Sequence, residues 1–222
     1  MANFDRDRLI DIYRKRARNY DLYAKLFPLV GFRQWTYREK AVQALHLQRG
    51  DTVVDIGCGT GLNFPLLQAA IGPEGAIIGV DLTDTMLAQA RKRAQDKGWS
   101  NVELVQSDAA EFRFPTGVDG IISTYAITLV PEFDRVIRNG CWALKPGKRW
   151  AIADFKMPSN ALSPLAPLLA LVLVRPFGGS IDLSSRHPWE SIGRYMQNTH
   201  MQDFYMGFVY VIVGERGESG CG

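Results

Sequence analysis

One short stretch, Asp55-Ile56-Gly57-Cys58-Gly59-Thr60-Gly61, limits the folds open to this chain more than any other feature. It ends the β-branched and apolar run Thr52–Ile56 and precedes residues 62–70, whose apolar side chains have helical spacing. Glycine tolerates positive φ and has no Cβ, so three alternate glycines form a turn whose backbone can approach a ligand closely. A strand, a glycine turn and a helix in this order predict one unit of a parallel α/β sheet.

The same alternation continues along the chain. Further strands are predicted at 76–81, 102–106, 120–125 and 149–155, with helices at 85–97 and 131–144. Strands joined by helices need right-handed crossovers, so we expect a doubly wound, mainly parallel α/β sheet with helices on both faces. The apolar run 204–213 is expected to add an antiparallel C-terminal strand, and the glycine-rich tail after it is expected to be mobile.

Two helices are predicted before the first strand. Residues 6–27 carry apolar or aromatic side chains three and four positions apart, and residues 33–47 continue this pattern up to Gly50, a residue suited to a helix end. We therefore divide the chain into a helical arm, 1–48, and a main domain, 49–222. Residues 1–40 hold ten basic and five acidic side chains, which fits either a solvated helix face or contact with an anionic membrane surface.

Residues 157–190 interrupt the alternation of strands and helices. Within them, residues 161–177 carry one charge and three prolines around a leucine-rich stretch. This apolar part is shorter than the roughly 20 residues that span a bilayer, so a transmembrane helix is not expected. We interpret it either as a buried helix or as an apolar surface beside a bound substrate.

The net charge and the cysteine content limit the kinds of protein that this chain can be. A formal net charge of +3 in 222 residues is too small to indicate a nucleic-acid-binding protein. Cys58, Cys141 and Cys221 lie far apart and lack the spacing of zinc ligands, which favours free thiols in a reducing compartment. The first residues lack an apolar signal region, so we expect a cytoplasmic protein, either free or peripheral at a membrane surface.

The spacing of the glycines separates this turn from the dinucleotide fingerprint, because Gly57-x-Gly59-x-Gly61 is not GxGxxG. VVDIGCGTG closely resembles motif I of the class I S-adenosylmethionine-dependent methyltransferases. The resemblance continues through VDLTDTML, VQSDAAEFRFP, DGIISTYAI and ALKPGKRWAIADF, over about residues 50–155. It implies a Rossmann-like fold with S-adenosylmethionine as cofactor and S-adenosylhomocysteine as product.

The resemblance also implies which residues bind the cofactor. A carboxylate at the end of the second strand would accept the ribose hydroxyls, and one after the third strand would contact the adenine amino group. Tyr20 and Tyr125 are the candidate catalytic residues, and Tyr13 is, with Tyr20, a candidate lid residue. The cofactor-binding candidates are Asp55, Gly57, Cys58, Gly59 and Gly61 in the turn, Asp81, Leu82, Met86, Asp108, Ala109, Thr124 and Tyr13.

Several of these residues can also be interpreted as having a structural role instead of a role in cofactor binding. Asp55 could cap the glycine turn and Asp108 could cap a helix, because aspartate is favoured in both roles. Cys58 is more typical of a small buried side chain than of a reactive thiol. His46 and His187 fit packing or surface positions, and the role of His200 stays open.

The acceptor of the methyl group is the least constrained part of the hypothesis. Methyl transfer from a sulfonium needs mainly positioning, and the core motifs contain no well-placed His or Glu, which favours an amine acceptor that needs no base. Within the class, the chain is most similar to the ubiquinone/menaquinone C-methyltransferases and to the phospholipid N-methyltransferases. We expect a small-molecule or lipid acceptor, first a phosphatidylethanolamine-like head-group amine. The alternatives are a quinone, an inactive cofactor-binding scaffold and a nicotinamide dehydrogenase.

Overall fold

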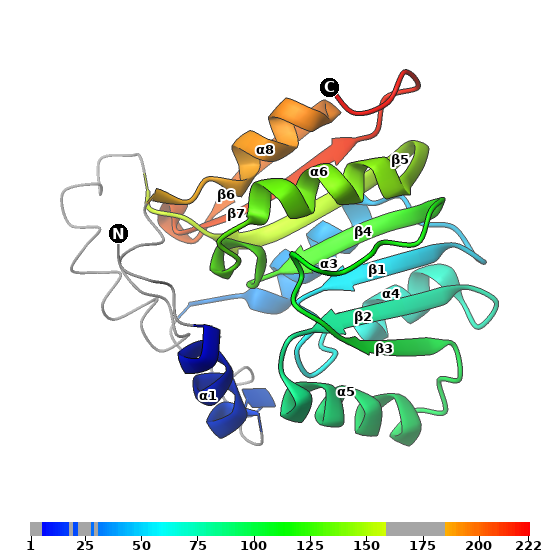
Figure 1. The fold of residues 1–222 in the computed structure, drawn as a ribbon, viewed down its shortest axis with the longest axis vertical. Helices are drawn as coiled ribbons and strands as arrows, with labels where there is room; N and C mark the ends of the chain where they lie inside the picture. The colour runs from blue at the N-terminus through cyan, green and yellow to red at the C-terminus, as the bar shows by residue number, and fades with distance from the viewer. Residues whose placement is uncertain (1–5, 18–19, 22–27, 29–30, 159–184) are drawn as a thin grey trace.

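The computed structural model describes residues 6–17, 20–21, 28, 31–158 and 185–222, and these form one seven-stranded sheet (Figure 1). The strand order is β3-β2-β1-β4-β5-β7-β6. The first five strands pair in parallel, and β7 is antiparallel to both of its neighbours. The strands are β1 (Thr52–Ile56), β2 (Ala76–Asp81), β3 (Val102–Gln106), β4 (Val118–Thr124), β5 (Leu144–Phe155), β6 (Gln197–Phe204) and β7 (Val209–Glu215). The predicted fold class is therefore confirmed.

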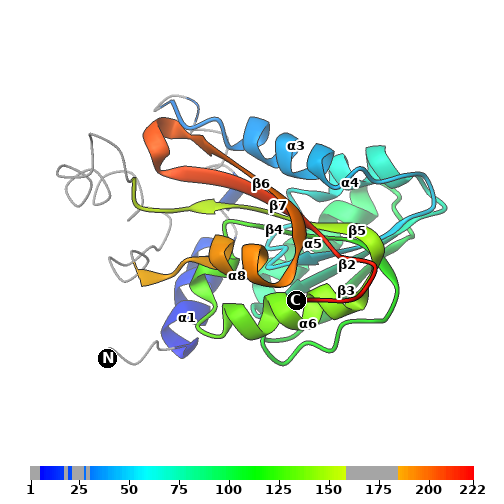
Figure 2. The same ribbon diagram turned by 90° about the horizontal axis from the view of Figure 1, so that it is seen from above.

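Helices cover both faces of this sheet. Figure 2 shows α3 and α4 on one side of the sheet, and α6 and α8 on the other. The described helices are α1 (Arg6–Arg16), α3 (Gln34–Ala44), α4 (Phe64–Ile71), α5 (Asp84–Asp96), α6 (Phe133–Ala143) and α8 (Pro188–Tyr195), with short 3-10 turns η2 (Ile127–Leu129) and η6 (Tyr205–Gly207).

Each strand contributes alternate side chains to two separate cores. In β5, Ala151, Ala153 and Phe155 pack with the layer of α3, α4 and α5. Trp150 and Ile152 pack with the layer of α6 and α8. Because successive strand residues point to opposite faces, a strand covered on both faces is apolar throughout, as the sequence suggested for the central strands.

The predicted element bounds are wrong at several places. The helix predicted for 33–47 ends at Ala44, and His46, with a φ of 53°, starts the turn that leads to β1. The strand predicted for 149–155 begins at Leu144, so it includes the predicted turn at 145–147. The run 204–213 divides into the end of β6, the turn η6 and most of β7. Most of β6 escaped prediction because it is a polar, exposed edge strand without apolar alternation.

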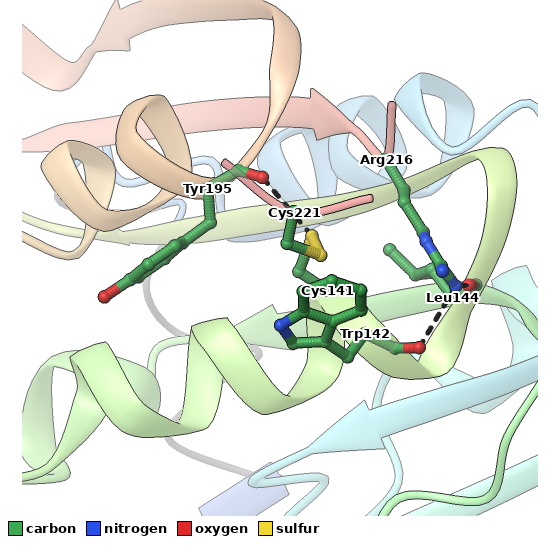
Figure 3. Close-up of a disulfide and its surroundings, with 6 residues drawn as sticks. All are labelled: Cys141, Trp142, Leu144, Tyr195, Arg216 and Cys221. Atoms are coloured by element: carbon green, nitrogen blue, oxygen red, sulfur yellow. Dashed lines mark hydrogen bonds between the residues drawn. A yellow bond between two sulfur atoms is a disulfide. The ribbon is translucent and has the colours of Figure 1, made fainter. Parts of the chain in front are cut away.

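The cysteines and the C-terminal tail also differ from expectation (Figure 3). Cys141, buried on α6, forms a disulfide with Cys221, 80 residues later in the chain. The tail predicted to be mobile lies against α6, and Arg216 Nη1 donates to the Trp142 carbonyl at 3.0 Å. The prediction of free thiols failed here because sequence separation does not reveal which side chains the fold brings together, and Cys58 is the cysteine that stays free.

Two further expectations concern membranes and the apolar insertion. Among the described residues, no helix combines the length and the hydropathy that crossing a bilayer requires. The apolar residues 161–177 lie outside the described residues.

Candidate cofactor site

A cavity lies at the carboxyl ends of the parallel strands, where open α/β sheets bind their ligands. The glycine turn after β1, the ends of β2 and β4, the loop after β3 and helix α1 contribute to its lining. Of the residues predicted from the sequence, the cavity is lined by Tyr13, Tyr20, Gly57, Cys58, Gly59, Asp81, Leu82, Met86, Asp108, Ala109, Thr124 and Tyr125. The fold therefore brings together side chains that are up to 112 positions apart, Tyr13 to Tyr125.

The glycine turn is held by β2 and by close packing. The N–H groups of Gly57 and Cys58 both donate to the Val80 carbonyl, at 2.8 and 3.0 Å. Gly57 has a φ of 69°, and a Cβ at this position would lie 2.2 Å from the Ala126 methyl carbon. Because the backbone conformation and the space both exclude a side chain, this position requires glycine. Gly61 does not line the cavity and instead lets the Phe64 ring approach, since its Cβ would lie 2.6 Å from that ring.

Asp81 ends β2 with its carboxylate at the cavity. Its two oxygens accept the N–H groups of Gly59 and Thr83, at 2.9 and 2.8 Å. Burial raises the pKa of Asp81, and these two backbone hydrogen bonds oppose the rise because they favour the charged form. The carboxylate keeps free lone pairs toward the cavity, as acceptance of ribose hydroxyls requires.

Asp55 lies beneath the cavity and does not line it. Its fully buried carboxylate accepts two contacts from the Asn63 side-chain amide, at 3.0 and 3.1 Å. Burial raises the pKa of Asp55 to about 7, while the Asn63 hydrogen bond and the Arg38 charge oppose that rise. These contacts join the end of β1 to Asn63, two residues beyond the glycine turn, and the role of Asp55 in orienting that turn stays a prediction.

Arg38 is a site residue that the sequence reasoning missed. Its side chain is buried, yet it lines the cavity, and it donates to Asn63 Oδ1 at 2.8 Å and to the Thr124 hydroxyl. Its guanidinium lies 5.0 Å from the centre of the Tyr125 ring, and its Nε has no partner within the described part of the chain. A signal existed in the sequence, because Arg38 occupies the apolar face that Ala41, Val42 and Leu45 define on the second predicted helix.

Three tyrosines contribute phenol side chains to the cavity wall. Burial raises the pKa of Tyr13, Tyr20 and Tyr125 above the ordinary value, so each is a neutral phenol near pH 7. Tyr125 has a φ of 58°, a costly conformation for a bulky residue and one that is often found at functional sites. The buried Tyr125 hydroxyl has no hydrogen-bond partner among the described residues.

Helix α1, which lies beside α5 (Figure 1), contributes Arg6, Leu9 and Tyr13 to the cavity lining and is attached by ion pairs. Arg6 reaches Asp108 at 2.6 Å and Glu132 at 2.8 Å, and Arg14 reaches Asp84 at 2.9 Å. Asp108 also accepts the Ala110 N–H at 2.8 Å, so its carboxylate supports a turn as well as facing the cavity. The sequence identified the helix but not the residues that attach it.

The histidines lie away from this site. None of His46, His187 and His200 lines the cavity. His46 contacts Arg149 at 2.9 Å, and His187 contacts Glu190 at 2.9 Å and stacks on the Trp189 ring. These positions agree with packing or surface roles for the first two.

The cavity fits S-adenosylmethionine on three structural grounds. The turn at Gly57 admits no Cβ, Asp81 presents a half-buried carboxylate acceptor, and the cationic Arg38 has an unpartnered Nε for an anionic group. No phosphate-binding feature is needed for such a ligand. The carboxyl edge of a parallel sheet is the general ligand site of open α/β folds, so this cavity is the expected place for the cofactor.

Comparison with known proteins shows which family the chain belongs to. The chain belongs to the methyltransferase domain family, whose pattern matches residues 47–172. It is 27% identical over 160 residues to a demethylmenaquinone methyltransferase of Listeria welshimeri, covering 72% of this chain and 67% of that protein. A ubiquinone/menaquinone biosynthesis C-methyltransferase of Pseudomonas putida is 30% identical over 157 residues, which are 70% of this chain and 60% of that protein.

Solved structures share the fold at lower identity. A methyltransferase from Aquifex aeolicus superimposes with a TM-score of 0.55 and 20% identity, covering 80% of this chain and 88% of the other. A phosphoethanolamine N-methyltransferase from Haemonchus contortus, solved with S-adenosylhomocysteine, has a TM-score of 0.62 and 15% identity over 83% of this chain and 53% of that one. The enzyme is therefore an S-adenosylmethionine-dependent methyltransferase.

Proposed function

We propose that this enzyme methylates a neutral amine nitrogen on the head group of an amphipathic, phosphatidylethanolamine-like acceptor. The observation that carries the proposal is the chemistry of the cavity wall. Tyr13, Tyr20 and Tyr125 are neutral phenols there, and the described lining residues include no histidine and no carboxylate beyond Asp81 and Asp108. A head-group amine is mostly an ammonium near pH 7 and must first lose a proton to water, but its neutral form then attacks without an enzymic base, whereas a phenol or a ring carbon needs one.

The cofactor would lie between the glycine turn and helix α1. Asp81 would accept hydrogen bonds from the ribose hydroxyls, and Asp108 would accept a hydrogen bond from the adenine amino group. Arg38 would pair with the carboxylate of the methionine part, since its planar guanidinium suits carboxylates and keeps one unpartnered N–H. Leu82 and Met86, which line the cavity together with Asp81, would pack on the adenine.

The transfer itself is an in-line displacement. The amine lone pair forms the new N–C bond while the S–C bond breaks, which leaves S-adenosylhomocysteine and a methylated ammonium that loses its proton to water. The Tyr125 and Tyr20 hydroxyls would accept the amine N–H groups and so direct the lone pair at the methyl carbon. The aromatic faces would stabilise the developing cation.

The apolar part of the acceptor has weaker support. Phe32 and Phe155 pack behind Tyr125, with ring centres 5.6 and 5.2 Å from the Tyr125 ring. The apolar residues 161–177, which suggested a lipid, lie outside the described residues. Arg6 and Arg14 of the basic arm pair with acids of the same chain, so contact with an anionic membrane rests on the remaining basic residues. The disulfide is more typical of an oxidising compartment, so a cytoplasmic location is not part of this proposal.

The test is transfer of radiolabelled methyl groups from S-adenosylmethionine to three acceptors: micellar phosphatidylethanolamine, free phosphoethanolamine and a reduced demethylmenaquinone. We expect label in the micellar amine. Tyr125→Phe should lower kcat by about tenfold or more with little change in cofactor affinity, because it removes one orienting hydrogen bond. Asp81→Ala should instead weaken cofactor binding, and the exposed Asp96→Ala should change neither quantity.

A quinol carbon is the second candidate, and it is favoured by the names of the relatives in Listeria and Pseudomonas. Label in the demethylmenaquinone and none in either amine would replace the first proposal with this one. Label in free phosphoethanolamine alone would keep the amine and remove the lipid. Binding of the cofactor without transfer to any of the three would favour an inactive scaffold.

A further inference from the structure

Asp154 is a buried carboxylate that the site described above does not use. It lies near the end of β5, is 3% exposed and does not line the cavity. One carboxylate oxygen accepts the Thr128 N–H at 3.0 Å, and the other accepts the Phe155 N–H at 2.8 Å. A buried carboxylate is costly even when it is hydrogen-bonded, so its presence beside one short turn calls for an explanation.

That turn carries one wall of the cavity. Tyr125, Ala126 and Leu129 line the cavity immediately before and within η2. Thr128, in the middle of the turn, is buried and is held at both of its backbone groups. Asp154 accepts its N–H, and Arg186 Nη1 donates to its carbonyl at 2.9 Å.

The same turn follows the unusual backbone of Tyr125. The Tyr125 N–H donates to the Ala153 carbonyl at 2.8 Å, which joins the residue to the strand that ends with Asp154 and Phe155. A left-handed conformation at a bulky residue persists only where its surroundings determine it. Here the strand holds Tyr125 from one side, and the turn fastened by Asp154 holds it from the other.

We propose that Asp154 is a positioning residue for methyl transfer, which fixes through Thr128 the turn that places Tyr125 and Leu129 beside the methyl acceptor. This inference rests on the proposed function, because it assigns Tyr125 to the acceptor. Asp154 itself touches neither reactant.

The charged and titratable groups around Asp154 are few. Arg186 donates to the carbonyl of Thr128, the residue whose N–H Asp154 accepts. Tyr210 pairs with Asp154 across strands β5 and β7, and Tyr13, Tyr125 and Tyr210 are close enough to Asp154 to interact with it electrostatically. Burial raises the pKa of all three tyrosines, so they stay neutral, and it raises the pKa of Asp154 to about 6. Protonation of Asp154 below that pH would weaken its grip on the Thr128 N–H.

The experiment compares the full-length wild type with Asp154→Asn. Asparagine keeps the shape but has one acceptor oxygen, so one of the two N–H groups loses its partner. We expect kcat to fall about 10- to 100-fold, as misplacement by about 1 Å can cause, with less than about a twofold change in the Kd of S-adenosylhomocysteine. The ratio of wild-type kcat to variant kcat should fall as the pH drops below about 6, because Asp154 is then protonated in the wild type, whereas groups that titrate in both proteins cancel in the ratio.

A control variant and a second measurement keep the inference separate from the choice of acceptor. Asp134→Asn changes a carboxylate that also accepts several hydrogen bonds, from Ser191, Tyr195 and Arg194, but that lies outside the cavity lining. It should leave kcat unchanged. Hydrogen exchange without any acceptor should accelerate in Asp154→Asn across residues 125–131 and stay unchanged across the turn at 57–61.

The possible outcomes are distinct. Unchanged exchange at 125–131, or kcat and pH dependence equal to wild type, would overturn the positioning role. A loss of cofactor affinity that parallels the loss of kcat would also overturn it, because it would indicate general damage to the site. Faster exchange at 125–131 in a protein whose wild type methylates none of the tested acceptors would retain the link from Asp154 to the turn and reject the proposed function.

Discussion

Arg38 and Asp55 are two buried ionisable residues next to the cofactor cavity. They are connected through Asn63, which donates to Asp55 and accepts from Arg38. The sequence identifies Asp55 as a candidate site residue in the glycine turn, but it does not identify Arg38, which belongs to a helix predicted for packing. Substitutions can separate the effect of Arg38 on ligand binding from the effect of Asp55 on stability.

Arg38→Met should weaken binding of S-adenosylmethionine by about 10-fold or more, because a charged hydrogen bond to a carboxylate contributes about 1.5–3 kcal/mol. Decarboxylated S-adenosylmethionine should bind wild type and variant with similar affinity, because it lacks the group that Arg38 would hold. Calorimetry with both ligands measures this difference. An equal loss for both ligands would indicate that Arg38 only supports the fold.

Asp55 should give the enzyme a pH-dependent stability in the absence of cofactor. Its pKa is about 7 in the folded chain, against an ordinary value of 3.8 for a solvated aspartate, so the folded state holds this proton more tightly. The contribution is full at pH below about 4 and is lost as the pH rises to about 7. The Tm of wild type minus that of Asp55→Asn should therefore fall between pH 5 and pH 8. Asp154 titrates in both proteins, so its effect cancels when the two Tm values are subtracted. A difference in Tm that stays constant with pH would contradict the raised pKa of Asp55.

At the scale of elements, α1 lines the cavity and is attached to the rest of the molecule by half-exposed ion pairs of Arg6 and Arg14. The side chain of Arg6 is 43% exposed, so each of its pairs stabilises the helix only modestly. Arg6→Gln should therefore raise the dissociation rate of S-adenosylhomocysteine about two- to fivefold, measured by displacement with excess ligand. Lys92→Gln, which removes an exposed pair within α5, is the control and should have no effect. A rate that is independent of Arg6 and of salt would exclude a closing role for α1.

Prediction from the sequence was most accurate for strands that are buried on both faces of the sheet. The strands β1 and β2, which lie inside the sheet, and the glycine turn were all identified, because an apolar run between turns has few alternatives. The edge strand β3, which is partly exposed, was identified as well. The sequence also identified ten lining residues of the main domain and both lid tyrosines. β6 and the end of α3 could not be predicted, since an exposed edge strand and a helix end depend on tertiary contacts that a local pattern does not contain. The hydrogen bonds and ion pairs of Arg6, Arg38 and Asp154 could not be predicted for the same reason.

At the scale of the whole molecule, the disulfide ties the end of the chain to the middle of the fold. A link across 80 residues restricts the unfolded chain strongly, and such links stabilise proteins by about 2–4 kcal/mol. Reduction, or Cys221→Ser, should therefore lower the free energy of unfolding by about that amount, measured by denaturant titration. Reductant should have no effect on the Cys221→Ser variant. A wild type insensitive to reductant would show that the two thiols are not joined.

The pairing of two cysteines leaves the third as a chemical reporter. Cys58 lies in the glycine turn, lines the cavity, and has a pKa that burial and the neighbouring Asp81 and Asp55 raise well above the ordinary value. Its thiolate is scarce, so alkylation at neutral pH should be slow and should require the cavity to be accessible. One mass increment on the oxidised protein, counted with and without ligand, would then measure how often the cavity is open, without any label and without knowledge of the acceptor.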